Sequence, residues 1–447
     1  MREGGLDAPV RQPLAWRDAD FADVDKIDAE MRRVFDICHG CRRCFNLCDS
    51  FPTLFDLIDD SQSGELDTVA SADFAKVVDG CTLCDMCFMV SCPYVPPHEF
   101  NLDFPHLMLR YRAAELNKGK GGGLAAELSK TDRNGKLARH VPGLANWASD
   151  TRNRLTRPLL ETVAGVHREA ALPKYHGTTF EEEAAPTVNE SAPAQGRKAV
   201  LYATCFVTYN NPAIGAAARR VLAHNGVETE VVYPRCCGMP QLEQGDLTAV
   251  AAAAVDVAEA MAPWLDKGYD VIALTPSCTL MLKFEWPLIL PGDARVKRLA
   301  EATYDIAEYV VDIAKTEGLA DGLRPLPGGV ALHMACHARA QNMGPKAAEM
   351  LRLVPEAEVS VIERCSGHGG SWGIMKAHFE TALKVGRPAA RLAAAAGKKY
   401  LASECPLAGT HLLQGIERQH KDDGPVPETT HHPIELFARA YGLGEAE

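Results

Sequence analysis

The chain has 447 residues, 15 cysteines and a formal net charge of -12. That length allows about three domains of ordinary size, so disulfide bonds are not needed for stability, and the acidic balance disfavours a nucleic-acid partner. Residues 1–14 lack the apolar core of a signal peptide, and no stretch approaches ~18 uninterrupted apolar residues. We therefore expect a cytoplasmic protein whose cysteines bind metal, with any membrane contact made through partners.

The first region, residues 20–117, is predicted to be an α-helical domain with cysteine-bearing loops. Apolar residues at helical spacing end just ahead of Cys38, and a short helix over residues 71–78 ends before Cys81. The cysteine loops are thus expected to be strung between helices.

Eight cysteines of this region form two runs of four, spaced C-x2-C-x2-C-x3-C and C-x2-C-x2-C-x4-C. In two-cluster ferredoxins the fourth cysteine of each run serves the other cluster, so the spacing predicts two [4Fe-4S] clusters. The predicted ligands are Cys38, Cys41, Cys44 and Cys92 for one cluster, and Cys81, Cys84, Cys87 and Cys48 for the other. Asp49 stands where a proline usually follows, and Cys92 is displaced by one residue. A zinc module or free thiols remain the alternative.

A cysteine-free connector is expected over residues 118–196. It holds the run Gly121-Gly122-Gly123, a helix-like stretch over 147–166 and an acidic linker with Pro and Ser over 181–195. The glycine run follows no strand and completes no G-x-G-x-x-G, so it does not indicate a dinucleotide site.

From residue 197 onward, short apolar strands alternate with longer helices, which predicts parallel βαβ units. Every cysteine in this half follows a predicted strand. The strands are expected at 198–204, 227–233, 270–275, 329–334, 358–362 and 399–403. The cysteine positions repeat after about 130 residues, which indicates two tandem α/β domains, 197–328 and 329–443, related by duplication. The fold class is therefore multidomain α+β, with a helical domain followed by two parallel-sheet domains.

Ligands of parallel sheets bind outside the carboxyl ends of the strands, so the cysteines of each domain could converge on one centre. The first domain offers Cys205, Cys236, Cys237 and Cys278, and the second offers Cys336, Cys365 and Cys405. His333, His337 and His368 lie beside the second set and could supply a fourth ligand or a proton. A degenerate copy kept for packing, an open iron-sulfur cluster and a three-ligand zinc are the alternatives for this second set.

Several segments resemble the duplicated cysteine-rich (CCG-type) domain of heterodisulfide reductase B subunits and their relatives, which include the iron-sulfur C subunits of anaerobic glycerol-3-phosphate dehydrogenases. The likeness covers roughly residues 30–442 and includes Cys236-Cys237-Gly238 and the stretches 203–212, 336–344, 365–373 and 432–436. In the family motif each domain carries a cysteine, then Cys-Cys-Gly, then Cys-x-x-Cys. Here Met281 replaces the last cysteine of the first copy, and Ser366 and Ala408 replace two in the second.

The resemblance implies a third [4Fe-4S] cluster in the first copy and leaves an additional cluster or metal in the second copy open. It also implies an electron-transfer subunit that relays electrons between a redox protein, either a flavoprotein dehydrogenase or a diiron oxidoreductase, and a downstream acceptor. One alternative is a heterodisulfide-reductase-like enzyme that reduces a disulfide or another small substrate at the C-terminal site. Another is an iron-sulfur redox sensor or scaffold.

Overall fold

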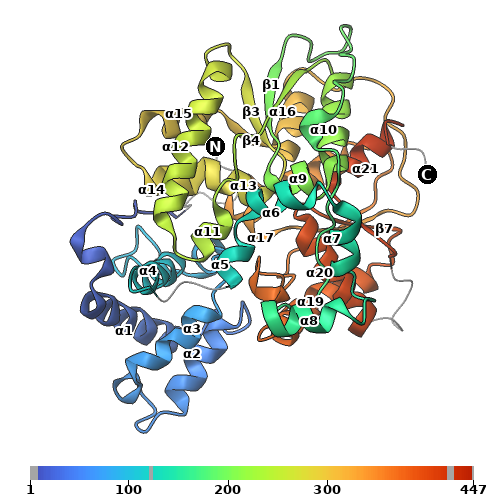
Figure 1. The fold of residues 1–447 in the computed structure, drawn as a ribbon. Helices are drawn as coiled ribbons and strands as arrows, with labels where there is room; N and C mark the ends of the chain where they lie inside the picture. The colour runs from blue at the N-terminus through green and yellow to red at the C-terminus, as the bar shows by residue number, and fades with distance from the viewer. Residues whose placement is uncertain (1–8, 120–123, 420–426, 445–447) are drawn as a thin grey trace.

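A computed structural model describes residues 9–119, 124–419 and 427–444. The N-terminal helices lie at the lower left of Figure 1, a first α/β region lies above them, and a second lies at the lower right. The connector helices cross the front of the molecule between these regions. The run Gly121-Gly122-Gly123 falls outside the described residues.

The N-terminal region is helical, and residues 9–119 contain no strand. Its helices are α1 (Val24–Cys41), α2 (Ser50–Asp59), α3 (Phe74–Asp79) and α4 (Phe104–Asn117), with a π-helical turn, η4, at Cys87–Ser91. Helix α1 runs through Cys38 and ends only at Arg42, where φ is 51°. The first cysteine loop therefore begins later than predicted, because helical hydrogen bonding continues to the Arg42 N–H, which donates to the Cys38 carbonyl at 2.8 Å.

The connector contains four short helices, α5 (Leu124–Leu128), α6 (Thr131–Ala138), α7 (Pro142–Ser149) and α8 (Thr156–Ala164). The prediction of one continuous helix over 147–166 is wrong. The chain is extended at Asp150, and the Asn153 side chain accepts from the N–H groups of Leu155 and Thr156, which starts α8 as a new helix. The predicted linker is irregular apart from a 3₁₀ turn at Phe180–Glu182, whose Phe180 is fully buried.

Two four-stranded parallel sheets follow, and they confirm the prediction of duplicated βαβ units. The first contains β1 (Lys198–Tyr202), β2 (Glu228–Val232), β3 (Asp270–Ala273) and β4 (Thr303–Asp305) in the order β2-β1-β3-β4. The second contains β5 (Val330–His333), β6 (Val359–Ile362), β7 (Tyr400–Ser403) and β8 (Thr430–His431) in the order β6-β5-β7-β8. Strands β4 and β8 were not predicted. They have three and two residues, too few to show an alternation of apolar and polar side chains.

The strand orders fix where ligands can bind. From the central strand β1 the chain steps first to β2 on one side and then to β3 on the other, and β5, β6 and β7 repeat this pattern. The crevice between β1 and β3, or between β5 and β7, is the topological switch point at which open parallel sheets hold ligands.

Helices cover both faces of each sheet. In the first domain they are α9 (Cys205–Tyr209), α10 (Pro212–His224), α11 (Met239–Glu243), α12 (Leu247–Leu265), α13 (Pro276–Leu280), α14 (Trp286–Ile289), α15 (Ala294–Glu301) and α16 (Ile306–Thr316). In the second they are α17 (Cys336–Ala340), α18 (Lys346–Arg352), α19 (Phe379–Ala395), α20 (Pro406–Gln419) and α21 (Pro433–Ala440). Helix α12 alone among the described helices is long and apolar enough to cross a membrane, and it packs against β3, α11 and α15.

The hydrophobic cores join the regions to one another. One core runs from Phe35 and Phe51 in the helical region to Val257 in α12, and another joins Leu201 of the first sheet to Leu332 of the second. The cysteine-bearing strand ends of both domains are therefore held in fixed positions relative to the helical region.

Candidate metal centres

The first set of thiols, the Cys38 site, comprises Cys38, Cys41, Cys44 and Cys92. Cys38 and Cys41 lie in the last turn of α1, whereas Cys92 follows the π-helical turn η4. Burial raises the pKa of Cys38, and the nearby Cys92, Cys44 and Cys41 thiols raise it further. The structure thus brings Cys92 to the three cysteines of the first run.

The second set, the Cys48 site, comprises Cys48, Cys81, Cys84 and Cys87. Burial raises the pKa of Cys48, with further contributions from Cys84 and Cys81, so this cysteine lies with the second run. Burial also raises the pKa of Cys84 to about 12. These pKa effects therefore group Cys92 with the first run and Cys48 with the second.

The backbone of the cysteine loops is strained. Arg42, Leu83, Asp85 and Thr204 all have positive φ values, between 49° and 62°, and each lies within two residues of a candidate cysteine. Such a conformation is costly for non-glycine residues, and it is found where surrounding structure or a ligand imposes it. The positive φ values therefore indicate that the surrounding structure or a bound ligand holds these loops in a costly backbone conformation.

The Cys205 site, formed by Cys205, Cys236, Cys237 and Cys278, lies at the carboxyl end of the first sheet. The Sγ atoms of Cys205 and Cys236 lie 3.8 Å apart, and those of Cys237 and Cys278 lie 3.3 Å apart. Cys205 opens α9 just past β1 and Cys278 lies in α13 just past β3, so these two thiols flank the switch point. The four predicted residues meet in one place.

Glycine is required after the paired cysteines. Gly238 has a φ of 86° and forms the N-cap of α11. A left-handed residue here turns the chain sharply from the strand end into the helix, and a side chain at this φ is strained.

Groups outside the cysteine motifs support the Cys205 site. The Asp132 carboxylate, from connector helix α6, accepts from the Cys236 N–H at 2.8 Å and from the Tyr233 hydroxyl. The Trp286 indole donates to the Cys237 carbonyl at 3.1 Å. Burial raises the pKa of Asp132, whereas the hydrogen bonds from Tyr233 and Cys236 lower it. Sequence reasoning missed Asp132, because nothing in the connector links it to the cysteines.

The Cys336 site comprises Cys336, Cys365 and Cys405. Burial raises the pKa of Cys336, and thiols of Cys84, Cys365 and Cys405 raise it further. The neighbours thus include a cysteine of the helical region, which joins this site to the Cys48 site.

Two of the three candidate histidines already have hydrogen bonds to both ring nitrogens. His333 bonds to the Ser403 hydroxyl at 2.9 Å and the Arg364 carbonyl at 3.1 Å. His337 bonds to the Ser277 hydroxyl at 2.9 Å and the Leu83 carbonyl at 3.2 Å. These contacts favour the packing role for His333 and His337.

His368 differs, because its buried Nε2 atom has no partner among the described residues. It lines a cavity of about 330 Å³ beside Cys205 and Cys405, together with His411 and Thr430. The His411 Nε2 and Thr430 Oγ1 atoms are likewise buried without a partner in the described chain. Burial lowers the pKa of His368 to about 3 and of His411 to about 4, so both rings are uncharged at neutral pH. No sequence motif indicated His411 or Thr430.

The donor sets consist of cysteine thiols, the residues that hold iron-sulfur clusters. Among the described residues, no three His, Cys, Asp or Glu side chains converge closely enough to hold one metal ion. Buried thiols that raise one another's pKa also need positive charge to ionise, and iron supplies it.

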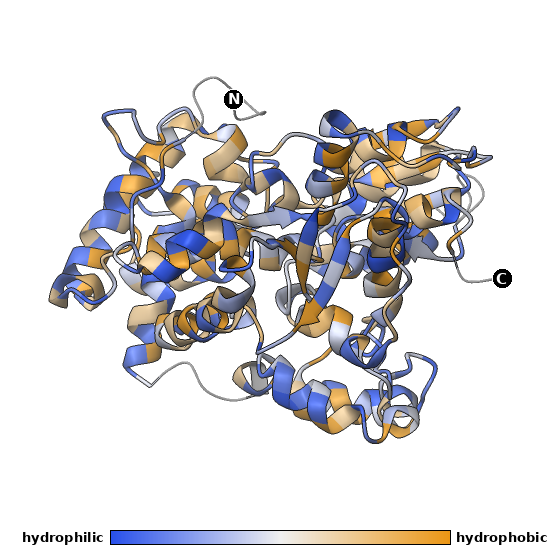
Figure 2. Cartoon of the chain, turned by 90° about the horizontal axis from the view of Figure 1, so that it is seen from above, coloured by the Kyte–Doolittle hydropathy of each residue, from blue (hydrophilic) through white to orange (hydrophobic). Residues whose placement is uncertain are grey.

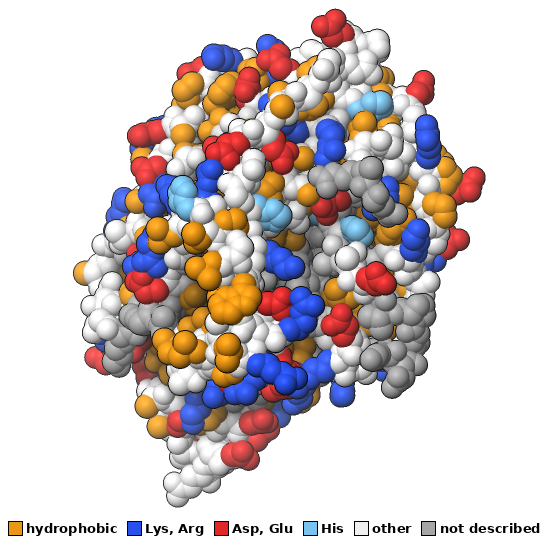
Figure 3. Space-filling model, turned by 45° about the vertical axis from the view of Figure 1, so that its right-hand side comes forward, with side chains coloured by type: hydrophobic (Ala, Val, Ile, Leu, Met, Phe, Trp, Pro, Cys, Tyr) orange, Lys and Arg blue, Asp and Glu red, His pale blue; other side chains and the backbone are white. Residues whose placement is uncertain are grey.

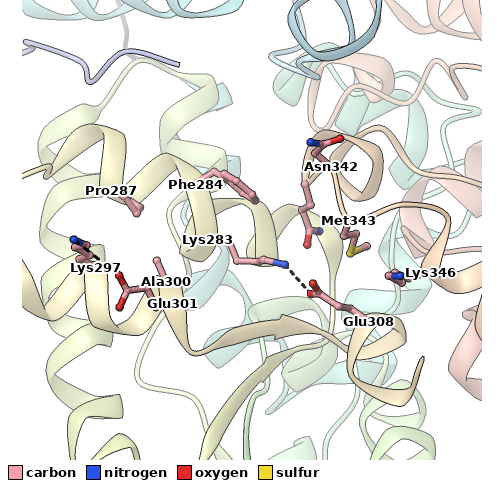
Figure 4. A pocket seen from close by; sticks show the side chains of 11 residues that line it. Lys283, Phe284, Pro287, Lys297, Ala300, Glu301, Glu308, Asn342, Met343 and Lys346 are labelled. Carbon is pink, nitrogen blue, oxygen red and sulfur yellow. Dashed lines mark hydrogen bonds and ion pairs between the residues drawn. The ribbon is translucent and has the colours of Figure 1, made fainter. Parts of the chain in front are cut away.

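A wider pocket of about 620 Å³ opens at the seam between the two α/β domains (Figure 4). Its lysines are paired: the Lys283 Nζ atom lies 2.7 Å from Glu308, and Lys297 lies 4.0 Å from Glu301. No cysteine lines this pocket. The candidate centres lie elsewhere.

Comparison with known proteins gives a consistent result. The model of the cysteine-rich domain family, CCG, matches twice, over residues 199–283 and 330–412. The C subunit of anaerobic glycerol-3-phosphate dehydrogenase from Escherichia coli K12 is 27% identical over 316 residues, 70% of this chain and 76% of that protein. Lactate utilization protein A from Geobacillus kaustophilus is 30% identical over 190 residues, 40% of this chain and 74% of that protein.

The B subunit of the fumarate reductase (CoM/CoB) from Methanothermobacter marburgensis is 27% identical over 257 residues, 55% of this chain and 47% of that protein. Both CCG matches cover a parallel sheet with its cysteine-bearing strand ends. The chain therefore belongs to the cysteine-rich CCG-domain family of iron-sulfur oxidoreductase proteins.

Proposed function

We propose that the protein is an electron-transfer subunit that carries electrons along a series of iron-sulfur clusters. The helical domain, residues 20–117, would hold two [4Fe-4S] clusters at the Cys38 and Cys48 sites in the manner of a dicluster ferredoxin. A connector over 118–196 joins it to CCG domains at 197–328 and 329–443. The first of these would hold a third [4Fe-4S] cluster at the Cys205 site.

One observation supports this proposal: a thiol of each set acts on the pKa of a thiol in the next set. Cys44 of the Cys38 site acts on the pKa of Cys87 in the Cys48 site. The Cys365 thiol acts on the pKa of Cys84, which joins the Cys48 site to the Cys336 site. Cys278 acts in turn on the pKa of Cys405, which joins the Cys336 site to the Cys205 site.

The Cys336 site, at the centre of this series, lacks a fourth cysteine. A cluster or metal there would shorten the step between the Cys48 and Cys205 sites. The clusters would supply one-electron redox chemistry, while the protein's own residues exclude water, fix the thiols and set the local charge.

Similarity to individual subunits of a dehydrogenase and of a reductase supports a role inside a multi-subunit complex. We propose a flavoprotein dehydrogenase as the electron donor and a second redox carrier as the acceptor. Purification from native lysate should recover a flavin-containing partner.

Anaerobic quantitation of iron and zinc, combined with electron paramagnetic resonance during a reductive titration, tests the cluster assignment. The proposal expects about twelve irons per chain, and fifteen or sixteen if the Cys336 site is also filled. About eight irons would confine clusters to the helical domain. One zinc per chain would overturn the assignment of the second half.

A second candidate function rests on the cavity beside the Cys336 site. Its unpartnered His368, His411 and Thr430 atoms suit a small hydrogen-bonding substrate, and Cys405 precedes two of its lining residues, Pro406 and Leu407. The protein would then itself reduce a disulfide or another small molecule there. If so, a disulfide should oxidise the dithionite-reduced protein, and His411→Asn should slow that step while leaving the iron content unchanged. Equal rates in both proteins would exclude this function.

A further inference from the structure

Helix α8 buries polar side chains and exposes apolar ones. Its polar residues Arg157 and Glu161 are 1% and 5% exposed, whereas Leu155, Leu159 and Val163 are 79%, 62% and 57% exposed. The three apolar residues are spaced by four, so they share one helix face. A helix that packs its apolar side against its own protein has the opposite pattern.

The same pattern continues along the two preceding helices. Helix α7 has no buried residue, and Leu144 and Trp147 on it are 62% and 54% exposed. Val141, just before α7, and Leu137 of α6 are also exposed. These seven residues form what we call the outward apolar face: Leu137, Val141, Leu144, Trp147, Leu155, Leu159 and Val163. They are half of all the large hydrophobic residues exposed in the described chain.

Hydrogen bonds hold this face outward. The Arg157 guanidinium donates to the carbonyls of Arg168, Ser149, His167 and Ala170 at distances from 2.7 to 3.3 Å. A rotation of α8 that buried its leucines would break all four hydrogen bonds. The four carbonyls would then lack a donor, which is costly. The apolar face is therefore a fixed feature of the fold.

Exposed positive charges lie on the same segment as the face. Residues 131–176 contain eight Arg or Lys against four Asp or Glu, in a chain whose net charge is -12. Of the eight, Arg157 is buried, and Arg133 and Arg139 pair with Glu127 and Glu182 outside this range. Lys136, Arg154 and Lys174 are exposed and form no ion pair with any described residue. In Figure 3 hydrophobic side chains gather on this side of the molecule next to Lys and Arg side chains.

We propose that the outward apolar face binds directly to the surface of an anionic lipid bilayer. Leu, Val and Trp side chains would enter the boundary between headgroups and acyl chains, and the surrounding Lys and Arg would meet the lipid phosphates. A lipid surface is favoured over a protein partner because the exposed Lys136, Arg154 and Lys174 carry charge opposite to that of the whole chain and would be attracted to anionic lipid. Seen from above, the connector helices lie at the edge of the molecule, outside both sheets (Figure 2).

Flotation of the full-length, iron-loaded protein with vesicles tests this proposal. We expect binding to phosphatidylcholine vesicles that contain about a quarter phosphatidylserine, weaker binding to phosphatidylcholine alone, and loss of binding as salt rises. The variant Trp147→Ser/Leu155→Ser should bind at least about tenfold less, and Lys136→Glu/Arg154→Glu should lose the preference for anionic lipid. Iron content and the paramagnetic resonance spectrum should stay unchanged in both.

A matched control is available on the second domain. Leu353 and Leu392 are 39% and 43% exposed but lie outside the outward apolar face, so Leu353→Ser/Leu392→Ser should bind vesicles as the parent protein does. Absence of vesicle binding by the parent protein, or an equal loss in this control, would overturn the proposal. So would a Trp147→Ser/Leu155→Ser variant that binds vesicles normally but fails to copurify with a flavoprotein partner, since the face would then be a protein interface.

Discussion

The Sγ atoms of Cys237 and Cys278 lie 3.3 Å apart although 41 positions separate the residues in the chain. They follow β2 and β3, the two strands that flank β1 in the sheet. Parallel connections place all three strand ends at one edge, and thus thiols from distant segments can meet. The contact marks the Cys205 site as one centre shared by three strands.

Replacing one thiol of this pair should remove one cluster only. We expect Cys278→Ser to lower the iron content by about four per chain, because Cys205, Cys236 and Cys237 alone leave a corner of the cluster without a thiolate. The resonance signals of the helical domain should persist. A loss of all the iron would instead mean that the variant fails to fold.

The charge on Asp132 should affect the reduction potential of a cluster at the Cys205 site but not its iron content. Its carboxylate accepts from the Cys236 N–H at 2.8 Å, so Asp132→Asn removes a negative charge next to the proposed cluster while keeping nearly the same shape. A less negative environment stabilises the reduced state, so one reduction potential should become more positive.

Potentiometric titration followed by paramagnetic resonance measures this shift. Asp150→Asn is the control, since Asp150 lies outside the Cys205 site and pairs with Arg152 at the surface. Iron content should be the same in both variants. Identical potentials in Asp132→Asn and the parent would contradict a cluster at the Cys205 site.

The left-handed turn at Gly238 gives a third prediction. A Cβ placed there would touch the Val250 Cα atom at 3.4 Å, and φ would remain at 86°. Gly238→Ala should therefore cost about 1–2 kcal/mol of stability, mainly from backbone strain. The midpoint of anaerobic urea unfolding measures this loss. Gly292→Ala, at a position with open space and ordinary φ, should leave the midpoint unchanged.

The sequence patterns predicted the secondary-structure elements that follow from the local periodicity of apolar residues. Alternating strands and helices placed six of the eight strands, and the rule that ligands bind at strand ends explains why Cys205 and Cys278 meet. Contacts between domains leave no local signal. The neighbours of Cys365 include Cys84 from a region far away in sequence, and only the packed core brings them together.

The sequence pattern gave a wrong prediction in the connector, where apolar residues face outward. The stretch 147–166 was predicted to be helix-like throughout, yet the helix breaks at Asp150, and Leu155 and Leu159 are exposed. The spacing of apolar residues shows that they share one face of a helix, but it does not show whether that face is buried or exposed. Arg11 was overlooked for a similar reason, since a lone charge near the N-terminus gives no sign of a buried partner.

Arg11 is the buried centre of an ion-pair network between the helical region and the first CCG domain. Its guanidinium lies 2.8 Å from Asp85, 2.8 Å from Asp103 and 3.0 Å from Glu285. Arg11 thus fastens the two regions together. Arg11→Ala would leave three carboxylates without their shared cation in a buried place, and we expect a loss of about 3–5 kcal/mol.

The loss should depend on pH in a defined direction. Burial raises the pKa of the Asp103 carboxyl, but the charges of Arg11 and His106 and their hydrogen bonds outweigh burial and hold it at about 2. An unfolded Asp titrates near pH ~3.9, so Asp103 stabilises the fold above that pH, and the contribution fades as the pH falls toward 2. Without Arg11 the larger part of this contribution is lost, because only His106 still stabilises the Asp103 carboxylate, and the deficit of the variant should be largest at neutral pH and shrink in acid.

Anaerobic urea unfolding at pH 7 and about pH 3 measures the difference. The control is Arg295→Ala, because Arg295 pairs with Asp293 and Glu259 at the surface, where its side chain is 47% exposed, and such a pair contributes about 1 kcal/mol or less. A deficit for Arg11→Ala that is no larger than this control, or that grows on acidification, would contradict a stabilising role for the buried network. A large deficit confined to neutral pH would identify Arg11 as the residue that fastens the helical region to the first CCG domain.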